Sequence, residues 1–199
     1  MTETQPDPAN PADALRVIGH QLVTEGSVIS PKIVPTDADP VFGKLVAAGP
    51  RAAKAPGEYA IVFEAIREGF LLHYGTPRLM DKPESNLALL AGDYLYALGL
   101  GRLSALDDPE AVAVLADLVA ISADLCARNP VSADAVAALW VATATSLATG
   151  IDSGFLEARQ QLRSDPIAAA GRLAAGAEQA AEAAGLRDKV RLCAASASQ

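Results

Sequence analysis

The segment from Ala135 to Ala148, AVAALWVATATSLA, carries no charged side chain and is apolar or hydroxyl-bearing on every side of a helix. With roughly 14 residues it is too short, and too rich in Thr and Ser, to span a bilayer. A helix that is apolar all round has to be surrounded by other protein elements. The sequence therefore predicts a helical bundle with this segment as its central, fully buried helix.

The composition favours the same fold class. Of the 199 residues, 51% are hydrophobic but only 5% are aromatic, and alanine makes up much of the apolar fraction. Such a chain suits closely packed helices better than a β-sandwich, which needs Val, Ile, Thr and aromatic side chains. We expect one all-α domain over residues 11–196, with a disordered N-terminal tail at 1–10 and a short tail at 197–199.

Start signals and apolar periodicity place about eight helices. Asp108-Pro109 and Asp165-Pro166 each combine an acidic N-cap with a proline at the first helical position. Asp108 and its neighbours in the sequence DDPE are thus interpreted as a helix cap and not as a metal-binding cluster. Residues 27–40 contain three prolines and are expected to be an extended connection. The eight helices are expected within 11–26, 41–49, 57–75, 83–106, 109–129, 132–150, 165–185 and the segment after 186, whereas residues 155–164 are recognised only as polar.

Charge and motif content exclude several functions. The formal net charge of −8 and the absence of a basic cluster argue against nucleic-acid binding. Cys126 and Cys193 are far apart, and His20 and His73 are isolated, so no metal site is expected; Cys126 is interpreted as a small buried hydrophobe and Cys193 as a tail thiol. No phosphate- or dinucleotide-binding motif indicates a cofactor. Without a signal peptide or transmembrane segment, the expected location is the cytoplasm.

The most unusual helix is the glycine-rich one, which contains the run LLAGDYLYALGLG. Each interior glycine costs about 1 kcal/mol of helix propensity relative to alanine. Gly92, Tyr96 and Gly99 recur at i, i+4 and i+7, so they share one face of the helix. That face is predicted to lie at a close helix–helix contact, and Gly99→Leu is expected to destabilise it by overpacking. Asp93 points off the face and is expected to be a buried, structural carboxylate that accepts a hydrogen bond.

Three segments resemble trans-polyprenyl diphosphate synthases. The run NLALLAGDYLYALGLGRLSALDDPEAVAVLADLV is similar to the part that follows the first aspartate motif of that family. AIVFEAIREGFLLHYG and ALWVATATSLATGID resemble the helices that lead into its first metal site and that present a diphosphate-binding lysine. The resemblance covers Pro56 to Ser153 and implies the all-α isoprenoid synthase fold, in truncated form. It also implies that the glycine face contacts either a neighbouring helix, a partner or an isoprenoid chain.

The residues that carry the chemistry of that family are missing here. Prenyl transfer uses Mg²⁺ held by two carboxylate clusters, because this ion prefers oxygen ligands. His73, Tyr74 and Gly75 stand where the family has His-Asp-Asp, and Asp81 remains without an acidic partner. At the second cluster only Asp152 remains, and the lysine before the buried helix is absent. The chain is interpreted as a degenerate relative with no catalytic residue, metal or cofactor.

These observations lead to two functional hypotheses. The first is a non-catalytic subunit that associates with a protein partner, a catalytic isoprenyl diphosphate synthase, in a hetero-oligomer or as a homodimer. The alternative is an accessory or assembly subunit of another complex, such as a respiratory, quinone-using one, which would place it at the membrane periphery through its partner. Because the small residues of segment 165–185 bury too little apolar area to cover the buried helix, an apolar face is expected to remain open for that partner.

Overall fold

The computed structural model describes residues 5–128 and 133–197, and within them the chain is all-α. Nine α-helices and three short 3-10 turns follow one another, and the β-structure of these residues is limited to one antiparallel bridge between Ile33 and Met80. The helices are α1 Ala14–Thr24, α2 Val41–Ala47, α3 Pro56–Tyr74, α4 Ser85–Ser104, α5 Pro109–Arg128, α6 Ala133–Thr149, α7 Ser153–Gln161, α8 Pro166–Ala184 and α9 Arg187–Ala197. The predicted all-α fold class is confirmed.

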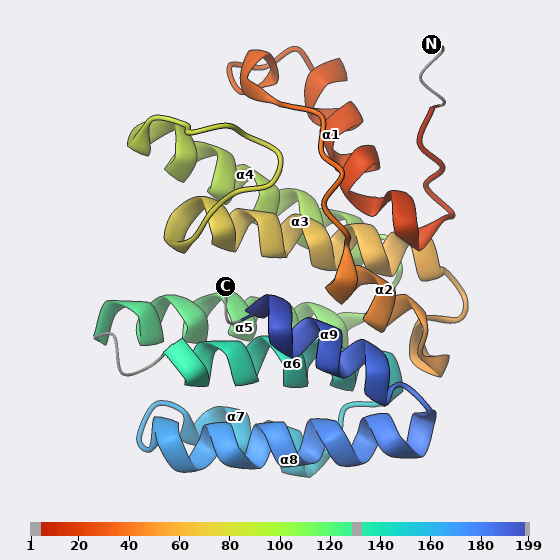
Figure 1. Cartoon of the computed structure of the whole chain (residues 1–199), viewed down its shortest axis with the longest axis vertical. Helices are drawn as coiled ribbons and strands as arrows, with labels where there is room; N and C mark the ends of the chain where they lie inside the picture. The colour runs from red at the N-terminus through yellow and green to blue at the C-terminus, as the bar shows by residue number, and fades with distance from the viewer. Residues whose placement is uncertain (1–4, 129–132, 198–199) are drawn as a thin grey trace.

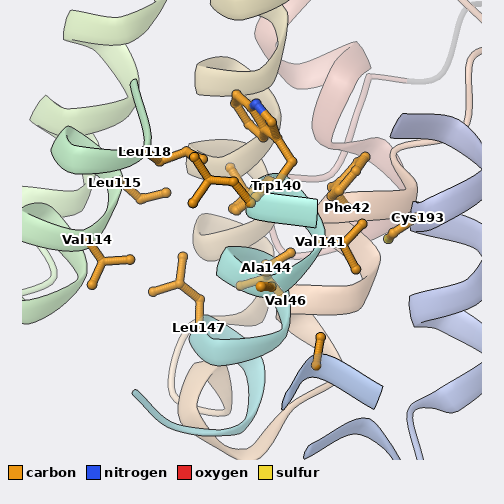
Figure 2. Close-up of a cluster of buried hydrophobic side chains, with 14 of the residues drawn as sticks. Phe42, Val46, Val114, Leu115, Leu118, Trp140, Val141, Ala144, Leu147 and Cys193 are labelled. Carbon is orange, nitrogen blue, oxygen red and sulfur yellow. The ribbon is translucent and has the colours of Figure 1, made fainter. Parts of the chain in front are cut away.

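The helix α6 lies at the centre of the bundle, as its sequence predicts. Helices α3 and α4 lie on one side of it and α7 and α8 on the other, while α5 runs beside it (Figure 1). Every side chain from Leu139 to Ala148 is buried. Trp140 is fully buried and packs edge-on against Phe42 and Phe63, at ring-centroid distances of 6.4 and 5.7 Å (Figure 2).

The C-terminal helices cover α6, so the expected open face on that side is wrong. The buried stripe of α8 consists of Ala169, Leu173, Ala177 and Ala181, one residue per turn. Alanine side chains let α8 lie close against α6, and this close approach makes up for the small area that each methyl group buries. α9 packs against both α6 and α2. It also corrects the interpretation of Cys193, whose thiol is fully buried within 3.4 Å of the Val41 carbonyl oxygen.

The helix starts follow the predicted caps. The Asp108 side chain accepts a hydrogen bond from the Ala111 N–H at 3.0 Å, and Asp165 accepts one from Ala168 at 3.1 Å. At the N-terminus, however, the disordered tail expected over residues 1–10 was extended too far along the chain. Part of residues 5–10 packs on the first turn of α3, where a side chain at Gly57 would meet the Pro8 carbonyl oxygen at 2.0 Å. Residues 1–4, 129–132 and 198–199 of the predicted tails and helix ends lie outside the described residues.

Candidate functional site

The glycine face of α4 packs on α3 of the same chain. A Cβ added at Gly92 would lie 2.3 Å from the His73 ring and 3.0 Å from the Gly69 carbonyl oxygen. At Gly99 it would meet Ile66 at 2.7 Å. Because Gly69 in turn faces α4, the two backbones approach closely at this crossing. Helix α3 thus fills the face of Gly92, Tyr96 and Gly99, which leaves no room there for a partner or an isoprenoid chain.

Asp93 is exposed, which corrects its assignment as a buried structural carboxylate. Its side chain keeps 75% of its exposure and lies 3.5 Å from Nε2 of His73. One residue turns a helix by about 100°, so the position after Gly92 leaves the contact with α3. The imidazole Nε2 lies 3.1 Å from the Leu89 carbonyl oxygen, and the ring packs edge-on against Tyr96. His73 therefore joins the end of α3 to the first half of α4.

The other residues of the degenerate metal motif are dispersed. Tyr74 is half exposed at the end of α3, and burial of its remaining part raises the pKa of its hydroxyl. Gly75 ends the helix, and Asp81 is exposed in the loop before α4. No hydrogen bond or ion pair between described residues joins Asp81 to His73. Over residues 5–128 and 133–197, no group of three or more His, Cys, Asp and Glu side chains is placed to hold a metal ion.

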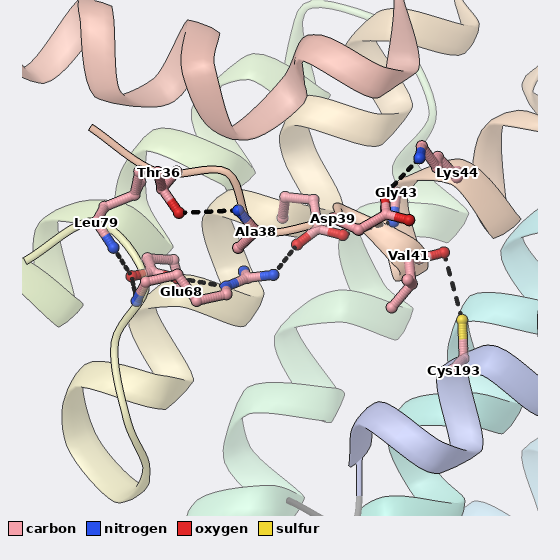
Figure 3. A network of polar contacts seen from close by, with 11 residues as sticks. Thr36, Ala38, Asp39, Val41, Gly43, Lys44, Glu68, Leu79 and Cys193 are labelled. Atoms are coloured by element: carbon pink, nitrogen blue, oxygen red, sulfur yellow. Dashed lines mark hydrogen bonds and ion pairs between the residues drawn. The ribbon is translucent and has the colours of Figure 1, made fainter. Parts of the chain in front are cut away.

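A buried charge cluster on α3 escaped the sequence reasoning. Glu64 and Glu68 are fully buried one turn apart, and Arg78 from the following loop forms an ion pair with each of them. Figure 3 shows Glu68 of this cluster beside Leu79 of the loop. The Arg78 guanidinium is 2.8 Å from a carboxylate oxygen of each glutamate. Burial alone would lower the pKa of Arg78, but the two carboxylates raise it above its ordinary value. The signal was present in the sequence FEAIREGF, where three charges interrupt an otherwise apolar helix.

Backbone groups take up the remaining acceptor capacity of these carboxylates. Glu68 accepts hydrogen bonds from the N–H groups of Arg78 and Leu79, at 2.6 and 2.8 Å. Glu64 accepts one from Gly43 at 2.7 Å, which ties α2 to α3. Both carboxylates are therefore committed to donors of the chain itself. The cluster fixes the loop after α3 and the start of α2, and it offers no free acid for proton transfer.

Arg67, the remaining charged residue of the run FEAIREGF on α3, is surrounded by three aromatic rings. The carbon at the centre of its guanidinium is 4.9 Å from the centroid of Trp140, 5.0 Å from Phe42 and 5.5 Å from Phe70. Only 6% of the residue is exposed. Burial, followed by the charge of Arg78, lowers the pKa of Arg67 to about 10. The side chain remains a cation at neutral pH, and its contacts with three ring faces stabilise the junction of α2, α3 and α6.

The face of α4 opposite Gly92 and Gly99 carries the main exposed apolar surface of that helix. Leu89, Leu90 and Tyr94 are 52%, 55% and 37% exposed, and Ala97 and Gly101 continue the surface along the helix. We call these five residues the outer face of α4. The Tyr94 hydroxyl donates to the Glu25 carboxylate at the end of α1, and burial followed by this bond raises its pKa to about 12. The outer face is therefore mainly apolar, with the exposed Asp93 carboxylate beside it, and its Tyr94 is held by Glu25.

The chain was compared with known proteins at three levels. No family model, no curated protein and no solved structure matches it. Within the described residues, no helix is both long and apolar enough to cross a membrane. The features available for a functional argument are therefore the outer face of α4 and the hollows on the surface.

Proposed function

We propose that this chain is a non-catalytic helical subunit that binds a protein partner through the outer face of α4. The observation that carries the proposal is the mismatch between the composition of α4 and its environment. Apart from Asp93 and Arg102, α4 is uncharged on all sides, and such a helix is normally buried on all sides. Here α3 covers one face, whereas Leu89, Leu90 and Tyr94 stay exposed on the other.

The expected partner is a catalytic isoprenyl diphosphate synthase. Support for it comes from the resemblance of Pro56–Ser153 to that enzyme family, together with the loss of the family's carboxylate pairs at His73–Gly75 and after Gly150. The commitment of Glu64 and Glu68 to Arg78 agrees with a structural role for α3. In this assignment the chain contributes a packing surface and the partner contributes the chemistry.

The test is affinity purification from the native host, with a matched pair of variants. Leu90 on α4 and Leu192 on α9 are almost equally exposed, at 55% and 58%. The wild-type chain and Leu192→Glu should recover the same partner in stoichiometric amount. Leu90→Glu should weaken recovery more than tenfold, because burying a leucine contributes about 1.5–3 kcal/mol and an interface charge adds a desolvation cost.

The recovered complex is then assayed with an allylic diphosphate, isopentenyl diphosphate and Mg²⁺. The complex should form the prenylated product, and the isolated chain should form none above a protein-free blank. Product from the isolated chain would refute the non-catalytic role. A stable monomer across a dilution series, with no protein recovered from cells, would refute the partner. Recovery of a respiratory enzyme instead of a synthase would favour the accessory-subunit alternative.

A further inference from the structure

A groove of about 650 Å³ runs between α1 and the extended segment 33–37. Figure 1 shows this segment passing alongside α1 on its way to α2. The floor contains Leu15 and Leu79, both almost fully buried, and Ile33 lies beside them. A second hollow of about 350 Å³ shares the residues around Asp37 with the first. The volume is in the range of small-molecule sites, which are concave and mainly apolar with a few polar groups.

Gly19 keeps the floor of this groove open. A Cβ at this position would lie 3.5 Å from Leu79 and 3.8 Å from Ile33, which is ordinary van der Waals contact. Close packing therefore does not require glycine here, in contrast to Gly92 and Gly99. Glycine inside a helix nonetheless destabilises the helix relative to alanine. What the missing side chain provides at Gly19 is depth in the groove.

Among the charged side chains that line the groove, the Asp37 carboxylate has no oppositely charged partner in the described part of the chain. The Arg16 guanidinium forms an ion pair with Asp13 at 3.0 Å, and Lys44 in the second hollow pairs with Asp39. Asp37 lines both hollows and is exposed, and it has no ion pair or hydrogen bond to any other residue in the described part of the chain.

The chain neighbours of Asp37 offer few hydrogen-bond donors, although the side chains of His20 and of Arg16, which is paired with Asp13, also line the groove. Pro35 has no N–H group, and the Thr36 hydroxyl accepts a hydrogen bond from Ala38. The formal charge of the whole chain, −8, has the same sign as the Asp37 carboxylate. A cation is therefore favoured at this rim, and a carboxylate or phosphate group is disfavoured.

From these observations we propose that the groove binds an organic amine with an apolar body. The body lies on Leu15, Ile33 and Leu79 in the space left by Gly19, and the protonated amine is placed beside Asp37. Charge complementarity and the apolar floor together select this occupant over an anionic amphiphile of equal size. The groove lies on the side of α1 that faces away from α4, so the proposal does not depend on the proposed protein partner.

The test is an NMR titration of the full chain with hexylammonium at pH 7, and with hexanoate as the probe of equal length and opposite charge. Hexylammonium should give saturable shifts at Gly19 and Asp37, and hexanoate should bind at least several-fold more weakly. Asp37→Asn should weaken the binding of hexylammonium by roughly twofold to fivefold, the range for an exposed ion pair.

Two leucine substitutions separate the groove from general effects. Gly19→Leu fills the groove and should weaken hexylammonium at least tenfold. Gly171→Leu is the control, because Gly171 lies on the exposed side of α8 with nothing within 4 Å of an added Cβ. It should leave binding unchanged. Equal binding of both probes, shifts that survive Gly19→Leu, or no saturable shift at all would each overturn the proposal.

Discussion

Two glycines in α4, Gly99 and Gly101, allow the packing of this helix to be measured against its intrinsic propensity. A Cβ at Gly99 would lie 2.7 Å from Cγ1 of Ile66 and 3.1 Å from the Val62 carbonyl oxygen. A Cβ at Gly101 would have nothing within 4 Å. Only one residue separates the two positions in the same helix. Gly99→Ala and Gly101→Ala therefore share every effect except the contact with α3.

The two substitutions should change stability in opposite directions. Alanine is better than glycine inside a helix by about 0.5–1 kcal/mol, and Gly101→Ala should gain that amount. Gly99→Ala gains the same propensity, but it forces Ile66 or the α3 backbone to move. Overpacking of this kind costs about 1–3 kcal/mol, and the backbone oxygen favours the upper part of the range. The net loss should be about 1–2 kcal/mol, which separates the two variants by about 2–3 kcal/mol.

Thermal unfolding followed by circular dichroism measures this difference. For a chain of this size, 1 kcal/mol corresponds to about 2–4 °C, so the melting temperatures should differ by about 4–12 °C. Urea unfolding at 25 °C gives the free energies directly. If both variants are stabilised equally, α3 and α4 do not approach each other as the structure describes, and the account of the glycine face is wrong.

Two further predictions concern buried charges and pH. Arg78→Met should lower the free energy of unfolding by about 3–5 kcal/mol in a urea titration, because Glu64 and Glu68 stay buried without their counter-charge; a loss below 1 kcal/mol would contradict the cluster. For Tyr59, burial and its hydrogen bond to Asp108 raise the hydroxyl pKa from 10.0 to about 12. Its contribution to stability is therefore fully present below pH 10 and is lost as the pH rises towards 12, and Tyr59→Phe should reduce this alkaline loss. Asp108 has the opposite dependence. Burial opposes the ionisation of Asp108, but hydrogen bonds from Arg51 and Tyr59 lower its pKa. Its contribution to stability is therefore present at a pH above the pKa of the unfolded chain, and it is lost as the pH falls through the lowered pKa of the folded protein.

Local signals were sufficient for most of the helices and for the centre of the bundle, but the polar segment that forms α7 was not recognised as a helix. The uncharged run Ala135–Ala148 could only be an enclosed helix, and Asp108 and Asp165 could be recognised as caps because a cap depends on residues within one turn. The coverage of α6 could not be predicted in the same way. A stripe of alanines buries little area per residue, and whether it covers a neighbour depends on how closely the two backbones approach, which is a tertiary property.

The charged residues of α3 show a second limit of the sequence. Glu64, Arg67 and Glu68 look like a polar interruption, and their burial depends on Arg78, which reaches them from the loop after the helix. Asp93 shows the reverse. Its apolar neighbours suggested burial, but α4 has cover on one side only. Local sequence does not specify which side of such a helix is covered.

The two faces of α4 have different roles, and the propensity cost of its interior glycines is explained by only one of them. Gly92 and Gly99 serve the contact with α3 inside the chain, since side chains there would collide with His73 and Ile66. They therefore supply no argument for a partner. That argument rests on the opposite face, where Leu89, Leu90 and Tyr94 are exposed although nothing inside the chain requires apolar residues there. A substitution at Gly99 that lowers stability and one at Leu90 that lowers only partner recovery would separate the two roles within one helix.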